Sequence, residues 1–154
     1  MAITHIREIP IALKPGDRLL GLDLGSKTIG VAITDSNFTV ASPLQIISRK
    51  KFSLDIIVLQ TIIKERCVGG IIIGLPKNMD GSEGPRAQST RQFAENFLKY
   101  VDIPIVFWDE RLSTIAVNRV LIDEADLSRQ KRSKIVDKLA ASFILQGAID
   151  LINN

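Results

Sequence analysis

The sequence predicts an α/β fold, a five-stranded mixed sheet with helices on both faces, and three observations lead to it. Residues 18–48 hold β-branched, apolar segments separated by tight connections, which predicts an antiparallel meander of three strands. From residue 52 the apolar residues recur at helical spacing. Two short, wholly apolar runs, 69–75 and 103–108, are typical of parallel strands buried on both faces. The later β-α-β units require parallel pairing with right-handed crossovers.

Each expected element has a local reason. Strand residues alternate or form buried β-branched runs, and the helices show one apolar face. Ser53 is a candidate N-cap and Pro85 can open a helix. Residues 1–16 are expected to be an extended lead-in with a mobile terminus, followed by a single domain over 17–152. The predicted strands are 18–24, 28–34, 40–48, 69–75 and 103–108, and the predicted helices are 52–67, 85–101, 114–124 and 133–152.

Composition excludes several kinds of site. The chain has 154 residues, and Lys plus Arg exceed Asp plus Glu by 20 − 17 = 3, which only weakly suggests an anionic partner. One cysteine allows no intrachain disulfide and no cysteine metal cage. The single histidine, His5, lies near the terminus, which argues against catalysis by a histidine triad. With no signal-like or membrane-spanning segment in the sequence, we expect a cytoplasmic protein.

Asp23 is the most unusual position, because it lies in an apolar strand within LLGLDLGSKTIGVAITDS, residues 19–36. Side chains of a strand alternate between its faces, so Gly21 and Gly25 flank Asp23 on its own face. Glycines are expected to leave open space above the carboxylate and to let a ligand approach closely. The alternative is an aspartate that caps its own hairpin, although such residues usually lie in the turn itself.

Two more acids, Asp109 and Glu110, directly follow the strand predicted over 103–108. Ligands of parallel sheets gather at the carboxyl ends of the strands, so both residues are candidates for a site. Arg111 comes next and could pair with Glu110 or contact a phosphate. Loop acids that cap the following helix are the alternative, and this motif alone is weak.

The last predicted helix contains Asp137, and Ala140 and Ala141 share its face. Small side chains let a helix approach a sheet closely, so Asp137 could reach toward Asp23. An acid at the boundary of an amphipathic helix is the alternative. If acids from the first strand, a later strand end and this helix converge, they suit divalent cations such as Mg²⁺, which prefer carboxylate oxygens. Metal-assisted phosphoryl transfer needs no histidine or cysteine.

Basic residues form two runs, SRQKRSKIVDK around Asp137 and SRKK after the third strand. A solvated charged face is the usual explanation for such runs. Because the first run leads directly into a candidate metal ligand, contact with nucleic-acid phosphates is favoured. Aromatic residues are sparse, so stacking on bases is not predicted. The basic residues are Arg129, Lys131, Arg132, Lys134 and Lys138 in the first run, and Arg49, Lys50 and Lys51 in the second.

Four segments resemble the sequence blocks of the YqgF family, also called RuvX, of bacterial Holliday-junction resolvases and pre-16S rRNA nucleases. These segments are GLDLGSKTIGVAITD, GLPKNMDGSEGPRA, DERLST and KIVDKLAASFIL, in this order within residues 18–152. The resemblance implies an RNase H-like fold, a cytoplasmic location and nuclease chemistry with a divalent metal, Mg²⁺ or Mn²⁺. It also implies a role in maturing the 5′ end of 16S rRNA, with RNA, branched DNA or a pre-ribosomal particle as partner.

By position, the resemblance assigns catalytic and metal-binding roles to Asp23, Glu110 and Asp137. Junction resolvases and RNase H enzymes usually have a fourth acid near the last one; no acid lies within one turn of Asp137, and Asp109 is the candidate substitute. The loop that contains Gly74, Pro76 and Gly81 is expected to wall the site. The residues expected to bind nucleic acid are Lys27, Arg111, Arg129, Lys131, Arg132 and Lys138.

Three functions are compatible with these patterns. The first is a metal-dependent endonuclease, for which sequence physics does not choose between RNA and branched DNA. The second is a nucleotide phosphotransferase, because DLGSKTIGVAI also looks like the first phosphate loop of actin-like ATPases and sugar kinases. Those proteins have two such domains, and this chain is too short for both. The third is a nucleic-acid-binding module that keeps the fold without catalysis.

Overall fold

The computed structural model describes residues 3–112 and 129–154, and the side chains of 3–112 and 139–154. This part of the chain forms a five-stranded sheet in the order β3-β2-β1-β4-β5. The strands are β1 (Arg18–Leu24), β2 (Thr28–Thr34), β3 (Ala41–Ser48), β4 (Val68–Leu75) and β5 (Ile105–Asp109). The helices are α1 (Ile9–Ala12), α2 (Phe52–Glu65), α3 (Pro85–Leu98), the 3₁₀ helix η1 (Glu110–Leu112) and α5 (Arg129–Asn153).

The sheet is mixed, as predicted. β1, β2 and β3 pair antiparallel in chain order, whereas β1, β4 and β5 pair parallel. The connection from β1 to β2 is tight because the backbone N–H of Gly25 donates to the carbonyl of Thr28 at 2.9 Å. The predicted meander and the predicted parallel half of the sheet are both confirmed.

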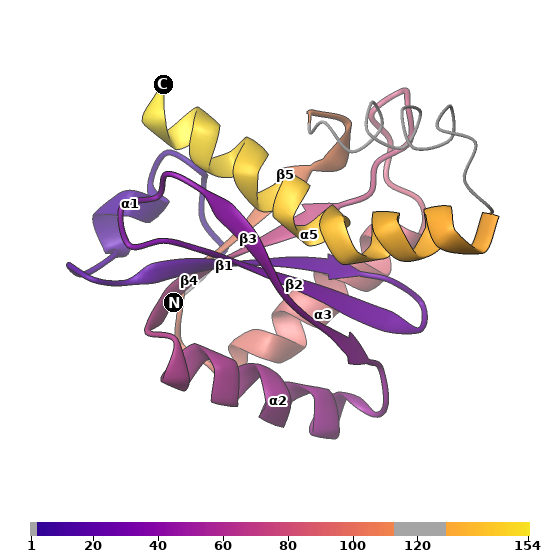
Figure 1. Cartoon of the computed structure of the whole chain (residues 1–154), viewed down its shortest axis with the longest axis horizontal. Helices are drawn as coiled ribbons and strands as arrows, with labels where there is room; N and C mark the ends of the chain where they lie inside the picture. Colours follow the sequence, from indigo (N-terminus) through magenta and orange to yellow (C-terminus); the bar gives the residue numbers. More distant parts are fainter. Residues whose placement is uncertain (1–2, 113–128) are drawn as a thin grey trace.

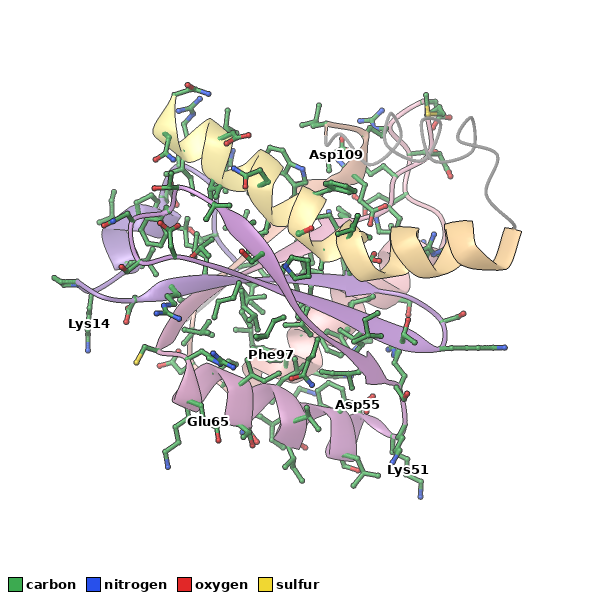
Figure 2. All side chains as sticks on the ribbon, viewed as in Figure 1. Lys14, Lys51, Asp55, Glu65, Phe97 and Asp109 are labelled. Carbon is green, nitrogen blue, oxygen red and sulfur yellow. The ribbon has the colours of Figure 1, made fainter. Side chains whose placement is uncertain are left out.

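Helices cover both faces of this sheet, with α2 and α3 on one side and α5 on the other (Figure 1). The interior strand β4, which lies between β1 and β5, shows why its sequence is apolar throughout. Ile71 and Ile73 are in the core cluster under α2 and α3, whereas Ile72 is in the cluster under α5. Phe97 of α3 is fully buried between the sheet and α2 (Figure 2). A strand buried on both faces has no room for polar side chains.

The amino-terminal segment differs from its prediction. It is not an extended lead-in, because residues 9–12 form α1 and the side chains of Ile6 and Ile9 are buried in the cluster under α5. The backbone N–H of Thr4 donates to the carbonyl of Ile105 at 2.8 Å, which ties the segment to β5. Apolar residues that look isolated in sequence thus find a core in the folded chain. The domain boundary at residue 17 stays a prediction.

Several helix boundaries also differ from expectation. Ser53 does not cap α2; instead, Asp55 reaches back and accepts a hydrogen bond from the backbone N–H of Lys50 at 3.0 Å. Figure 2 shows Asp55 and Lys51 at this end of the helix. α5 begins at Arg129, four residues before the predicted start. The helix predicted over 114–124 lies outside the described residues. Within the described ranges, no helix combines the length and the hydropathy that crossing a membrane requires.

Candidate functional site

The carboxyl ends of four strands meet at one edge of the sheet, which we call the carboxyl edge. β1, β4 and β5 are parallel, so Leu24, Leu75 and Asp109 all end there. β3 returns in the same direction because it is two antiparallel pairings away from β1, and its last residue, Ser48, pairs with Thr28. Loops that are far apart in sequence are therefore gathered at this edge, where open α/β sheets bind ligands.

Asp23 is half-buried near the end of β1, and glycines surround it on the neighbouring strands. On β2 its direct partner is Gly30. On the other side, the parallel register pairs Leu22 with Ile73. One residue further along these strands, Asp23 lies beside Gly74. Neither neighbour carries a side chain, so the carboxylate is not crowded from either adjacent strand.

Gly21 has a different role from the one expected. A Cβ at this position would lie 2.8 Å from the Cβ of Leu145 and 3.0 Å from the carbonyl oxygen of Ala141. At Gly21 the missing side chain leaves no open space, because Leu145 and the backbone of Ala141 in α5 fill it. The same contact confirms that this helix approaches the sheet closely at its small residues. Ala140 and Ala141 are both buried.

The direction of α5 places its amino-terminal half toward the carboxyl edge. At the opposite edge, the side chain of Gln146 accepts a hydrogen bond from the backbone N–H of Ala41 at 2.9 Å. Still further along the helix, the side chain of Asn153 donates to the carbonyl of Phe38 at 2.8 Å. Residues that precede Ala141 thus run toward the end of β1, across the sheet as seen in Figure 1. Asp137 is one helical turn before Ala141, and its side chain lies outside the described residues.

Glu110 begins η1 directly after β5 and turns back over β4. A Cβ at Gly74 would lie 2.8 Å from Oε1 of Glu110 and 2.5 Å from Cδ1 of Ile144. The Glu110 carboxylate therefore occupies the space that the missing side chain of Gly74 leaves. Because neighbouring strands are about 4.8 Å apart, this carboxylate and that of Asp23 share one small area of the α5 face. The structure thus brings together two of the three predicted acids.

Asp109, in contrast, is engaged by Arg111. The guanidinium donates to both carboxylate oxygens of Asp109, with Nη2 at 2.7 Å and Nε at 3.1 Å. Hydrogen bonds from the Arg111 side chain lower the pKa of the Asp109 carboxyl. Figure 2 places Asp109 at the end of β5. Metal ligation by Asp109 would require this pair to separate, which argues against it as the fourth acid.

Arg111 also connects the site to the loop that follows β4. Its Nη1 donates to the carbonyl of Met79 at 3.1 Å, and both Nη atoms lie within 3.7 Å of a Cβ position on Gly81. Gly81 has φ of +90°, a conformation that favours glycine. Within the loop, the hydroxyl of Ser82 donates to Asp80 at 2.6 Å and lowers the pKa of that carboxyl. The loop expected to wall the site is thus held beside Glu110.

The Asp109–Arg111 pair predicts a specific dependence of stability on pH. The pKa of Asp109 in the folded protein lies below its ordinary value of about 3.9, so the pair contributes stability above that pH. The contribution is lost as the pH falls through the folded pKa. We expect the free energy of unfolding to fall less steeply below about pH 4 in Asp109→Asn than in wild type.

Urea unfolding of both proteins at several acidic pH values measures this difference. Other carboxyls with a lowered pKa, such as Asp35, titrate in both proteins and therefore cancel in the comparison. Parallel curves for wild type and Asp109→Asn would contradict a stabilising role of the ion pair.

The predicted nucleic-acid-binding residues have different placements. Lys27 is exposed in the β1–β2 turn at the carboxyl edge, and Arg111 is held by Asp109 and Met79. The other four belong to α5, but their side chains lie outside the described residues: Arg129, Lys131, Arg132 and Lys138.

Sequence reasoning missed two features that surround the acids. It did not identify Gly30 or the space over Gly74 as part of the site, although the tight β1–β2 turn, continued as a hairpin, would have paired Asp23 with Gly30. It also expected Arg111 to pair with Glu110 or to contact a phosphate, whereas in the structure Arg111 pairs with Asp109 and holds η1 to the loop through Met79. No sequence pattern indicates that link, because its partners Asp109 and Met79 are thirty residues apart.

The donor set fits a divalent cation. Asp23 and Glu110 offer carboxylate oxygens, and Glu110 can lie over β4 because Gly74 has no Cβ. Hard cations such as Mg²⁺ prefer oxygen ligands. Among the side chains that the structure describes, no three potential ligands come together. A third ligand would come from α5, where Asp137 is the predicted residue.

Comparisons with known proteins agree with this architecture. A family model described as "RuvX: Holliday junction resolvase" matches residues 17–151. A relative from Ruegeria pomeroyi is 53% identical over 154 residues, which cover 100% of this chain and 99% of the relative. One from Rhodobacter capsulatus is 59% identical over 132 residues, 86% of this chain and 82% of the relative. Both relatives are named "Putative pre-16S rRNA nuclease".

A solved structure confirms the RNase H-like fold. RuvC of T. thermophilus, in complex with a Holliday junction substrate, aligns with a TM-score of 0.54 at 9% identity. The alignment covers 90% of this chain and 97% of RuvC. Together with the family model, which matches 17–151 and so includes all four sequence blocks up to residue 145, these relatives show that the chain belongs to the RuvX family.

Proposed function

We propose that the protein is a metal-dependent endonuclease that hydrolyses phosphodiester bonds at Asp23, Glu110 and Asp137. The observation that carries this proposal is the position of the Glu110 carboxylate over Gly74, beside Asp23. Asp23 of β1 and Glu110 of η1 lie on the same face of the sheet at the carboxyl edge, and α5 runs toward this edge with the third acid. A structural role alone would not require two carboxylates over glycines.

The three acids would hold the cation. A divalent cation bound there would neutralise charge on the phosphate and make the attacking water more acidic. Asp23, on the rigid central strand, fixes one side of the site. Glu110 lies over the adjacent strand β4, on the 3₁₀ helix that the Arg111–Asp109 pair ties to the end of β5. Fixing both acids on packed elements reduces the reorganisation that the reaction requires.

For the substrate, we propose the 5′ region of precursor 16S rRNA, as RNA alone or within a pre-ribosomal particle, in the cytoplasm. The names of the full-length relatives support this substrate. Branched DNA is the second candidate, because the family model is described as a Holliday junction resolvase. Lys27 and the basic residues of α5 are proposed to contact phosphates. The full-domain family match favours both candidates over a nucleotide phosphotransferase.

The test is cleavage of a 5′-extended 16S rRNA precursor and a four-way DNA junction, side by side. Each substrate is incubated with Mg²⁺, with Mn²⁺ or with EDTA. We expect cleavage of the RNA with either metal and none with EDTA, because the acids need a cation to activate water. Preferential cleavage of the junction would instead support the DNA substrate. If the protein binds both substrates and cuts neither, the catalytic proposal is wrong, and a nucleic-acid-binding module is supported instead.

A further inference from the structure

A small basic pocket lies at the carboxyl edge, on the face of the sheet opposite to the acids. Its floor is Leu24, which belongs to the core cluster under α2 and α3. Asp23 is one residue earlier and points to the α5 face, so β1 separates the acids from this pocket. The pocket has a volume of about 180 Å³ and is lined also by Gly25, Ser26, Arg49, Arg86, Ser89 and Thr90.

Two arginines from different elements line the pocket. Arg49 follows β3 directly, and Arg86 lies in the first turn of α3. None of the lining residues in the described chain is acidic. Among the described side chains, the arginines seen in ion pairs are Arg91 and Arg111, so neither Arg49 nor Arg86 is in one of these pairs. Two cations that share a hollow without a carboxylate repel each other, and a bound anion would relieve that repulsion.

The guanidinium of Arg49 is held in place by the protein itself. Nη1 of Arg49 donates to the carbonyl of Gly25 at 2.6 Å, and its guanidinium carbon lies 5.9 Å from the ring centroid of Phe93. An arginine has five N–H donors, so this anchoring bond leaves others available. Ser26 and Ser89 add exposed hydroxyls. Arg49 is therefore a fixed donor, and its planar guanidinium group matches the geometry of a phosphate.

The size of the pocket limits its ligand. Small-molecule sites usually have volumes of about 300–1,000 Å³, so about 180 Å³ suits a phosphate group better than a nucleotide with its base. The position limits it further, because the pocket and the acids lie on the two sides of one strand end. Successive phosphates of a strand are about 3.4 Å apart along the helix axis. A strand that crosses this edge therefore passes both within a few nucleotides.

We propose that this pocket binds a backbone phosphate of the substrate strand, a few nucleotides from the bond hydrolysed at Asp23 and Glu110. This inference rests on the proposed function. Phosphate contacts fix the register and orientation of a nucleic acid without reading its sequence. Arg49 and Arg86 are thus positioning residues. Their loss affects binding more than the chemical step.

The test compares Arg86→Ala with Arg66→Ala. Both residues are exposed, but Arg66 follows α2 and precedes β4, at the opposite edge of the sheet. Affinity for the precursor RNA and for the four-way junction is measured in EDTA at several salt concentrations. We expect Arg86→Ala to weaken binding and to reduce the slope of log K against log[salt] by about 0.7–1. Arg66→Ala should keep the wild-type slope and the wild-type cleavage rate, whereas the loss in Arg86→Ala should appear in KM more than in kcat.

An unchanged slope in a folded Arg86→Ala, checked by thermal melting, would overturn the proposal. Arg49→Lys provides a second variant. It retains the positive charge but loses the planar guanidinium with its paired N–H donors, so it should weaken binding with little change in the salt slope. Inorganic phosphate is the alternative ligand. If phosphate raises the Tm of wild type but not of Arg86→Ala, and the salt slopes of the two proteins agree, the pocket binds free phosphate and the proposal is wrong. Cleavage retained in Asp23→Asn would instead refute the proposed function.

Discussion

Replacing Asp23 by asparagine will abolish cleavage of the preferred substrate and leave the fold intact. The change removes one negative charge and keeps the shape, so no cavity forms in β1. The amide has the same shape as the carboxylate, and Gly30, the direct partner of Asp23 on β2, carries no side chain, so the amide fits where the carboxylate was. Loss of a ligand from a metal-dependent site is expected to reduce kcat by roughly 10³-fold or more.

Asp150→Asn is the matched control, because it makes the same chemical change at the carboxyl-terminal end of α5, away from the site. Asp150 is exposed and accepts a hydrogen bond from Gln146 at 2.9 Å, far from the carboxyl edge. Single-turnover cleavage and thermal melting are measured for both variants and wild type. Asp150→Asn should cut at the wild-type rate. An Asp23→Asn protein that melts like wild type and cuts equally fast would remove Asp23 from the catalytic site.

Replacing Gly74 by alanine will reduce kcat without touching any acid. The new Cβ would lie 2.8 Å from Oε1 of Glu110 and 2.5 Å from Cδ1 of Ile144, so both side chains must move. Each is the far end of a flexible side chain, and the cost in stability is therefore limited to about 1–3 kcal/mol. Displacing a catalytic group by about 1 Å can cost 10²-fold in rate, and we expect a decrease of that order.

Gly84→Ala is the control for this variant. A Cβ at Gly84, in the loop before α3, would lie 3.7 Å from Asn78, which is an ordinary contact. kcat and KM are measured at a temperature well below the Tm of each protein. Gly74→Ala should lower kcat and keep the affinity measured in EDTA, whereas Gly84→Ala should change neither. Full activity in Gly74→Ala would show that the position of the Glu110 carboxylate does not limit the reaction.

The sequence by itself determined the sheet and its layers, because periodicity is a local property. Alternation in 18–48 predicts the meander, and the wholly apolar run around Ile72 predicts a strand buried on both faces, as the two core clusters confirm. The unusual mid-strand position of Asp23 was also visible in the sequence. Its interpretation as a site residue came from glycine neighbours and from a family resemblance, which the comparisons bear out at the level of the family.

Only the tertiary structure decided what surrounds the acids, because those contacts join residues far apart in the chain. The strand register places Gly74 beside Asp23, and the turn after β5 brings Glu110 over it. Sequence spacing could not show that α5 fills the space at Gly21. It also could not show that Arg86 and Arg49 line one pocket, since they belong to different elements 37 residues apart. Local patterns predict elements, whereas the site depends on how the packed elements are aligned.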